Sequence, residues 1–537
     1  MSKRFRTCDL DQFFLLPPAL QDWLPENHLA RFVADVVNEL DLSAIYAEYE
    51  RRDGRGQSAY HPLAMVRLLL YGYCIGVTSS RKIEQATYDD VAFRYLAADQ
   101  HPDHDTIASF RQEHLQWLAG VFVQALRLCE KAGMVKLGHV AIDGTKIKAN
   151  ASTRRSVSYK KLSEREKYWQ DLVAELLKKA QQTDEEEERR CGPGQLADTV
   201  PEELAHAESR LKRIRQAKAE LEQEAKQQLQ AIEQQHQPRK PGRPRKQEQP
   251  AQSPPDAKQR NKNRHRYKRA QQRAKHPTRQ YNFVDPDSRV MKDIGTKSFV
   301  QAYNAQAAVD SHAQVIVAAE VTQEVIDRQQ LVPMVQSVCT TTGKRPEMVT
   351  ADAGYWDTDS LHQEILRGIE VLVPPDSTYA APDSTALPQN APRNEEATRM
   401  REVLGSAEGK AKYGARKITV EPVFGQIKEV RGIRRFRLRG IVPVRAEWKL
   451  ICGTHNLLKL FRHRMGTVHR TAAPRRKGRR LQSQFQSLLR KPSARPHCGL
   501  RFRNFLPSGH PRSVGCVPRV RFSLRQAPWL RQFGSGR

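Results

Sequence analysis

The chain has 537 residues, which is long enough for two or three domains, and 39% of them are hydrophobic, as in a globular protein. Its 90 Lys and Arg against 60 Asp and Glu give a formal net charge of +30, which points to nucleic acid as a polyanionic partner. The eight cysteines form no CxxC pair, and no stretch approaches the ~20 apolar residues of a membrane span. Together these features argue against a zinc site, secretion and membrane insertion, and favour a cytoplasmic, nucleoid-associated protein.

Residues 1–130 are expected to form an all-helical domain that binds DNA. The apolar residues of its first helix recur at helical spacing and predict one buried stripe, formed by Leu29, Phe32, Val33, Val36, Val37 and Leu40. A second helix is predicted over residues 63–74, and a third, capped by Ser79 or Ser80, over residues 81–97. The short turn between these two helices allows a helix-turn-helix, but an ordinary helical bundle explains the pattern as well.

Residues 136–465 are expected to form a mixed α/β domain. A short β run begins at His139 and is expected to end at Asp143-Gly144. Two longer β runs meet at a turn beginning with Asp310. Alternating helices and strands follow, and the predicted ranges are 327–338 (helix), 347–351 (strand), 359–368 (helix) and 369–375 (strand). This order is typical of a mixed sheet covered by helices.

An insertion of about residues 151–297 interrupts this domain. It contains two helix-like stretches separated by Cys191-Gly-Pro-Gly. The second stretch places apolar residues near heptad positions a and d, which predicts a helical hairpin with a seam of Leu204, Ala207, Leu211, Ile214, Leu221, Ala225 and Ile232. Lys218 and Gln228 interrupt this seam, so a long solvated pair of helices is the alternative.

Two basic segments are expected to be disordered without DNA. Residues 235–279 are rich in Pro, Gln, Lys and Arg. Within them, Arg243 and Arg245 belong to a Gly-Arg-Pro segment that resembles a minor-groove AT-hook, although a basic linker fits equally well. The tail, residues 466–537, is the second segment. From residue 461 onward there are 19 Lys and Arg and no acidic residue, so only +11 of the net charge of +30 belongs to the preceding chain.

Three carboxylates stand where a metal-dependent phosphodiester chemistry would need them. Two divalent cations about 4 Å apart can activate an attacking oxygen and stabilise a leaving oxygen, and Mg²⁺ prefers carboxylate ligands. Asp143 and Asp352 each follow a predicted strand, and Glu421 is expected in the first turn of an amphipathic helix capped by Thr419. We therefore predict Asp143, Asp352 and Glu421 as catalytic and metal-binding residues.

Each of these carboxylates also has an ordinary explanation. A strand-terminal Asp before Gly is commonly part of a turn, and a first-turn Glu stabilises the helix dipole. Asp310 is the rival candidate, because it also ends a strand.

The surroundings of Glu421 favour a DNA site. Lys428 lies two helical turns further along the same face, where it can contact a phosphate. Residues 428–440 contain six Lys and Arg in thirteen positions. The predicted DNA-binding residues here, besides the more distant Arg243 and Arg245, are Tyr413, Arg416, Lys428, Arg431, Arg434 and Arg435.

Several stretches of the chain resemble the DDE transposases of bacterial insertion sequences. The stretches are VAIDGTKIKANAS, AYNAQAAVD, VTADAGYWD, YGARKITVEPVFGQIKEVRGIRRF and WKLICGTHNLLKL, together with YHPLAMVRLLLYGYCIGVTSSRKIE near the N-terminus. Four residues separate Arg416 from Glu421, where the family's Tyr-Arg-Glu-Lys motif usually has three, so either Arg416 or Lys417 fills the basic position.

The resemblance implies a ribonuclease-H-like core in which Asp143, Asp352 and Glu421 hold two Mg²⁺ ions, with Mn²⁺ as a substitute. Activated water would cut the inverted-repeat ends of the element, and the freed 3′-hydroxyl would attack target DNA. Double-stranded DNA is the implied partner, and the pairing of two ends implies a homodimer. The alternatives are a catalytically inactive DNA-binding protein or repressor derived from a transposase, and a two-metal nuclease that hydrolyses DNA without joining it.

Overall fold

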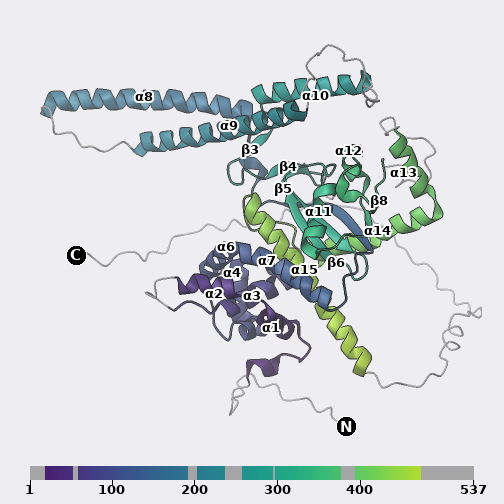
Figure 1. Ribbon diagram of the computed structural model, residues 1–537. Coiled ribbons are helices and arrows are strands. Elements are labelled where there is room, and N and C mark those ends of the chain that lie inside the picture. The colour runs from purple at the N-terminus through teal and green to yellow at the C-terminus, as the bar shows by residue number, and fades with distance from the viewer. Residues whose placement is uncertain are drawn as a thin grey trace, which may run out of the picture. The chain divides into compact units, whose positions relative to one another are not determined.

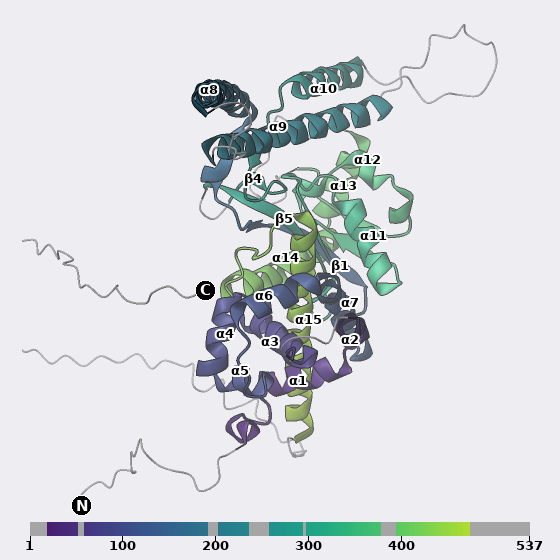
Figure 2. The same cartoon turned by 90° about the vertical axis from the view of Figure 1, so that its left-hand side faces the viewer.

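The computed structural model describes residues 19–51, 58–191, 202–235, 257–293, 297–376 and 394–472. All of these residues belong to one compact unit, Met1–Ala473. Figures 1 and 2 show this unit in two views at right angles.

The N-terminal region is helical, as predicted. A 3₁₀ turn at Leu20–Trp23 precedes the helices α1 (Leu29–Glu39), α2 (Ser43–Glu50), α3 (Pro62–Ile75), α4 (Ser80–Asp89), α5 (Val91–Leu96), α6 (His104–Glu113) and α7 (Leu115–Lys131). Phe32, Val33, Val36 and Val37 of α1 are buried, which confirms the predicted stripe. The apolar core of these helices is continuous with that of the sheet described below.

The predicted third helix is in fact two, α4 and α5. Asp90 leaves the helical conformation (φ −114°, ψ 119°), and its carboxylate accepts a hydrogen bond from Ala92 N at 2.7 Å. This cap starts a new helix, because it satisfies a backbone donor that has no partner within α5. α3 and α4 meet at 99°, within the range of helix-turn-helix motifs. In the part of the chain that the structure describes, no single helix is long and apolar enough to cross a membrane.

The predicted mixed sheet is present. Its strands are β1 (His139–Lys148), β4 (Arg289–Lys292), β5 (Phe299–Asp310), β6 (Val315–Thr322), β7 (Met348–Thr350) and β8 (Glu370–Leu372). The order is β6-β5-β1-β7-β8, and β4 pairs with the beginning of β5. β5 is antiparallel to both β1 and β6, whereas β7 is parallel to β1 and β8 is parallel to β7.

The prediction that β1 ends at Asp143-Gly144 is wrong. Asp143 pairs with Ala307 and Gly144 with Gln306, and the ladder continues to Lys148. A strand continues where each residue has a cross-strand partner, and β5 is long enough to supply one at every position. The space beside Gly144 is filled, because a Cβ there would lie 2.9 Å from Asp327 Oδ1. Gly144 therefore leaves room for polar side chains above the sheet and makes no turn.

Helices cover the sheet and join it to the N-terminal region. α11 (Leu331–Thr342) packs on β5 and β6, α13 (Glu395–Gly405) precedes α14 (Ala407–Gly425), and α14 packs on β1 and β5. α15 (Ile441–Ala472) contacts α7 and α3 as well as β6, so it runs between the N-terminal helices and the sheet (Figure 1). The helix expected over residues 359–368 is absent. Instead, α12 (Thr358–Leu361) makes a single turn and a 3₁₀ turn follows at Glu364–Leu366.

The insertion forms the predicted helical hairpin. α8 (Tyr159–Cys191) packs against α9 (Glu202–Gln235), and β2 (Ser156–Ser158) pairs with β3 (Gln280–Asn282) at its base. Most of the predicted seam is buried, from Leu204 to Ala225. Lys218, which interrupts the seam, is paired with Glu166 at 2.9 Å. The polar position is therefore accommodated by a partner on the opposite helix.

Part of the basic segment predicted to be disordered is a helix. α10 (Ala257–Lys275) lies beside α9 in both views (Figures 1 and 2). Ala270 is buried, and Tyr267 OH donates to Glu233 of α9 at 3.1 Å. Packing on α9 thus stabilises a sequence that is too polar to predict as ordered. Arg243 and Arg245 lie outside the described residues.

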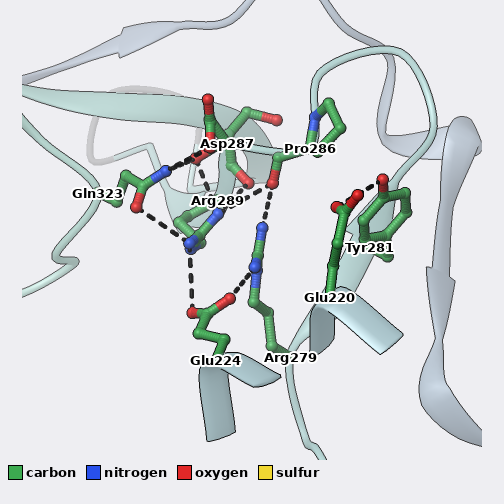
Figure 3. A network of polar contacts seen from close by, with 9 residues as sticks. Glu220, Glu224, Arg279, Tyr281, Pro286, Asp287, Arg289 and Gln323 are labelled. Atoms are coloured by element: carbon green, nitrogen blue, oxygen red, sulfur yellow. Dashed lines mark hydrogen bonds and ion pairs between the residues drawn. The ribbon is translucent and has the colours of Figure 1, made fainter. Parts of the chain in front are cut away.

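A polar network ties the hairpin to the sheet (Figure 3). Glu224 of α9 pairs with Arg279 and, at 3.3 Å, with Arg289 at the start of β4. Arg289 also donates to Gln323, just after β6, at 3.1 Å. These charge-assisted bonds fix the base of the hairpin on the sheet. At the other end of the chain, α15 continues to Ala472, past residue 466 where the tail was expected to begin, and residues 473–537 lie outside the described part.

Candidate active site

Asp143 lies in the middle of β1 and faces α14. Its Oδ2 accepts a hydrogen bond from Arg416 at 3.1 Å. Burial raises the pKa of Asp143 to about 6; the charge of Arg416 opposes this rise, and that of Asp352 adds to it. Asp143 is therefore a half-buried carboxylate with one cationic partner and a second carboxylate in electrostatic reach.

Asp352 follows β7, on the strand next to β1. The parallel ladder pairs Ala141 with Thr350, so Asp143 and Asp352 stand two residues beyond one paired position. Asp352 caps a 3₁₀ turn by accepting from Gly354 N at 2.9 Å. Burial raises its pKa, Arg416 and the Gly354 bond lower it, and Asp327 raises it. The fold thus brings Asp143 and Asp352, which are far apart in the sequence, close together near the end of β7.

Glu421 stands near the end of α14, and the prediction that it lies in a first turn is wrong. α14 begins at Ala407, where Ser406 accepts a hydrogen bond from Gly409 N at 3.0 Å. Pro422 lies inside the helix and lacks the N–H that would bond to Ile418 O. Gln314 fills that place, because its Nε2 donates to Ile418 O at 2.7 Å. The helix therefore passes through Pro422.

The side chain of Glu421 is exposed. Arg416 and Lys428, on either side of it along the chain, both reach β1, and Lys428 Nζ donates to Thr145 Oγ1 at 3.0 Å. Among the described residues, no three His, Cys, Asp or Glu side chains are close enough to hold one ion together. The structure thus joins Asp143 and Asp352, and places Glu421 on the adjoining helix without contact to either.

Two family models match the chain. One, described as Transposase domain (DUF772), matches residues 18–113, and the other, described as Transposase DDE domain, matches residues 380–461. Together the two matches support an insertion-sequence DDE transposase. The second match contains Tyr413, Arg416, Glu421 and Lys428, whereas Asp143 and Asp352 lie outside both matches. No curated protein and no solved structure matches the chain.

Of the two candidates for the basic position, Arg416 and Lys417, it is Arg416 that faces the carboxylates. Arg416 is buried and bonded to Asp143, while Lys417 is exposed. Arg416 also lies over the ring of Tyr413, with its guanidinium carbon 5.9 Å from the ring centroid. Arg416 therefore contacts a carboxylate in the folded protein and is not exposed for the DNA contact that we predicted.

Arg431 was also predicted to bind DNA, and this prediction is wrong. Its side chain is 5% exposed, and its guanidinium donates to Tyr73 O, Ile451 O and Thr454 Oγ1 at 2.9 to 3.3 Å. These acceptors belong to α3 and α15. The guanidinium of Arg431 links α3 to α15 through these hydrogen bonds, so it is not accessible to a phosphate.

Arg434 and Arg435 are exposed, as DNA-binding residues must be. Arg434 forms an ion pair with Glu429. The backbone of Arg435 forms an isolated parallel β-bridge with that of Lys148, at the end of β1. Arg434 is therefore held in an ion pair within the fold, whereas the exposed Arg435 lies where β1 ends.

Asp310, the rival carboxylate, has a structural role. It accepts hydrogen bonds from the backbone N–H groups of Leu137 (2.5 Å), His312 (2.8 Å) and Lys136 (3.1 Å). These bonds hold the β5–β6 turn against the start of β1. A buried carboxylate satisfied by backbone donors on this side of the sheet stabilises the turn.

Lys146 and Asp327 are polar residues of the site that the sequence did not reveal. Asp327 Oδ1 accepts from Asn304 Nδ2 at 2.5 Å and from Gln306 Nε2 at 2.7 Å. Lys146 Nζ lies 3.7 Å from the same oxygen. Burial lowers the pKa of Lys146, and the charges of Asp327, Asp352 and Asp143 raise it. The one indication of this cluster in the sequence was Gly144, whose missing side chain leaves room for Asp327.

Proposed function

We propose that this transposase binds the inverted-repeat ends of its insertion sequence and catalyses Mg²⁺-dependent DNA cleavage and strand transfer. Asp143, Asp352 and Glu421 are the proposed catalytic carboxylates. The observation that carries the proposal is the placement of Asp143 on β1 and of Asp352 just after the adjacent parallel strand β7, beside α14, which bears Glu421. We also propose that the sheet is a ribonuclease-H-like core, with β6-β5-β1 as its antiparallel half and β1-β7-β8 as its parallel half.

The donor set suits Mg²⁺ or Mn²⁺. Asp143 and Asp352 are half-buried oxygen donors, and the pKa of each is raised mainly by this burial, so a divalent cation would stabilise their charged forms. Asp143 and Asp352 would hold the ions together with Glu421, whose exposed carboxylate has no hydrogen-bond or ion-pair partner among the described residues and is available to complete the set. Bound divalent cations supply activation of the attacking oxygen and stabilisation of the leaving oxygen.

The other residues of the site bind and orient the substrate. Lys428 stands beside Thr145, close to Asp143 along β1, and offers a point charge to a phosphate next to the scissile bond. Arg434 and Arg435 extend this basic surface, and Tyr413 supports Arg416. Arg416 neutralises Asp143 and holds its carboxylate toward α14. Pairing of two element ends requires a dimer, which we include in the proposal.

The test is cleavage of DNA that carries the element's ends, in Mg²⁺ and in Mn²⁺, by Asp143→Asn, Asp352→Asn and Glu421→Gln. Each variant is expected to lose on the order of 10³-fold in rate, because it removes a ligand of the charge-stabilising metal. Glu408→Gln on the same helix is the matched control, since Glu408 is exposed and pairs only with Lys412. Full activity of Asp143→Asn, with loss in a well-folded Asp310→Asn, would sink the assignment.

Asp327 competes with Glu421 as the third carboxylate, because its charge raises the pKa of the nearby Asp352. Calorimetric measurement of Mn²⁺ binding to Glu421→Gln and to Asp327→Asn distinguishes the two candidate ligands. We expect Glu421→Gln to weaken binding more, since Asp327 already accepts from Asn304 and Gln306.

Two other functions remain to be distinguished. A non-catalytic DNA-binding protein is not favoured, because the second matching model describes a DDE domain. A nuclease that hydrolyses without joining predicts cut ends and no joined products. A strand-transfer assay with pre-cut ends and a supercoiled target decides between these outcomes.

A further inference from the structure

A basic pocket lies at the base of the α8–α9 hairpin. Its volume is about 520 Å³, and it lies between the segment leading into β2, the first turns of α8, and α9. Five arginines line it, and we refer to it as the arginine pocket: Arg154, Arg155, Arg165, Arg210 and Arg213. All five side chains belong to exposed residues.

The charge of the arginine pocket is not compensated within the fold. Within the described ranges, none of its five arginines has a hydrogen bond or ion pair to an acidic side chain. Neighbouring basic residues outside the pocket are paired. Arg215 lies 3.5 Å from Glu166, Lys218 pairs with the same carboxylate, and Arg279 pairs with Glu224. The hairpin thus places its carboxylates away from the pocket, which leaves a concentrated positive charge for a polyanion.

Aromatic rings line the same pocket. Tyr168 is 61% exposed, although it is a large apolar ring, and it meets Trp169 edge-on with ring centroids 5.6 Å apart. Phe283 also lines the pocket, and its ring meets that of Tyr281 edge-on. Exposed rings beside arginines suit bases that present a free face, and in a duplex those faces are stacked on one another. The combination therefore favours an unpaired strand over a duplex.

The pocket is built on a rigid base. Val157, Leu162, Ile214 and Leu221 form an apolar cluster beneath it, against which Trp169 and Phe283 pack. The network of Figure 3 joins α9 to β4 and to the end of β6, so the pocket is fixed on the sheet that carries Asp143. Arg154 and Arg155 follow β1 closely in the chain.

We propose that the arginine pocket binds an unpaired stretch of a DNA strand, with phosphates on the arginines and a base against Tyr168. This inference rests on the proposed function, because the unpaired strand is the one exposed when an element end is opened for cutting. The role is one of positioning: the pocket holds a strand and takes no part in the chemistry.

Binding is measured by fluorescence anisotropy with the full-length protein in EDTA, so that no cleavage occurs. The probes are a labelled 20-nucleotide single strand and the same sequence as a blunt duplex. The variants are Arg210→Ala/Arg213→Ala and Tyr168→Ala, and Arg215→Ala is the control, since Arg215 lies on the same helix but outside the pocket. Tyr168 is exposed enough that its replacement leaves the fold intact.

For the single strand, the double variant is expected to reduce the slope of log affinity against log salt by about 1.4, because two phosphate contacts are lost. Tyr168→Ala is expected to weaken binding by about 5-fold or more, the loss of one stacked base. Arg215→Ala and duplex binding change far less. Equal losses in Arg215→Ala, or equal losses for duplex and single strand, overturn the proposal.

The two proposals fail in different ways. If wild type cuts element ends and the pocket variants bind single strands normally, the pocket proposal is wrong and the proposed function stands. If wild type binds single strands through the pocket but cuts no DNA in either metal, the proposed function is wrong and the pocket proposal stands.

Discussion

The basic stretch after Glu421 and the arginine pocket of the insertion differ in what their charges do. In the first region, Arg431 bonds to three acceptors in α3 and α15, Arg434 pairs with Glu429, and Arg437 donates to Thr78. In the second, five arginines from three segments of the chain line one cavity, with no ion-pair partner among the described residues. The denser run of arginines in the sequence is therefore the one more occupied with holding the protein together.

The comparison teaches that basic charge indicates DNA contact only where the fold leaves that charge unpaired. A guanidinium has five donors in a fixed plane, so it serves equally well to cross-link backbone carbonyls or to bind phosphate. Which of these it does depends on the acceptors that the tertiary structure places around it. The following predictions test whether charges around the active site stabilise the fold while those of the arginine pocket do not.

The largest effect is expected for Arg431→Met. Its removal breaks the hydrogen bonds from the guanidinium to Tyr73 O, Ile451 O and Thr454 Oγ1 in the core, and a hydrogen bond from a charged donor contributes about 1.5–3 kcal/mol. We expect a loss of about 3 kcal/mol or more in the free energy of unfolding, measured by urea denaturation. Arg434→Met, which breaks an exposed pair, should lose less than about 1 kcal/mol. Equal stability of the two variants would contradict the comparison.

A pH-dependent effect of similar size is expected at Asp143. Burial raises its pKa in the folded state to about 6, above the ordinary 3.8 that it has when unfolded. The folded protein then holds this proton more tightly, so the stability that Asp143 contributes is complete below pH 4 and is lost as the pH rises through 6. The loss amounts to at most about 3 kcal/mol. In EDTA, Asp143→Asn should gain stability relative to wild type between pH 4 and pH 7; a constant difference would refute this.

A smaller effect is expected for Lys146→Met. The ammonium lies 3.7 Å from Asp327 Oδ1 and within electrostatic reach of Asp143 and Asp352. Removing it increases carboxylate repulsion, but burial also disfavours the ammonium and lowers its pKa, so we expect a loss of at most about 2 kcal/mol at pH 7 in EDTA. Mn²⁺ should restore part of it, as seen in thermal melts. Lys449→Met, which breaks a partly exposed pair with Glu320, is the control and should show neither change.

The smallest effect on stability is expected for Arg210→Ala/Arg213→Ala. Both arginines are exposed and bond to no carboxylate of the described residues. Their replacement should change the free energy of unfolding by less than about 0.5 kcal/mol. A loss comparable to that of Arg431→Met would mean that the pocket arginines also hold the fold, and the contrast between the two regions would disappear.

Local periodicity was sufficient to predict the helices that pack through an apolar face, because many different apolar neighbours can cover such a face. The stripe of α1 and the heptad seam of α9 are present as predicted, because any apolar neighbour satisfies an apolar face. Five of the six strands of the sheet were also recognised, but their ends were not, and β4 lies in the stretch that was predicted to be an insertion. β1 continues past Asp143 only because β5 supplies partners up to Lys148.

For other helices, contacts with residues distant in the sequence decided where the helix forms and how far it extends. α14 passes through Pro422 because Gln314, distant in the sequence, bonds to the carbonyl that proline leaves free. α10 is a helix because α9 supplies an apolar contact and Glu233. Neither partner can be inferred from the residues nearby.

For the candidate site, the sequence by itself determined the residue types: Asp143, Asp352 and Glu421, with basic residues beside Glu421, and membership of the transposase family follows from such motifs. Only the tertiary structure decided which of them meet. Asp143 and Asp352 lie close together, and Arg416 donates a hydrogen bond to Asp143. Arg431 is buried in the core, and Lys146 and Asp327 lie near the two carboxylates. The reason is physical: a side chain's chemistry is local, but its partner, its burial and hence its pKa are set by residues brought together by the fold.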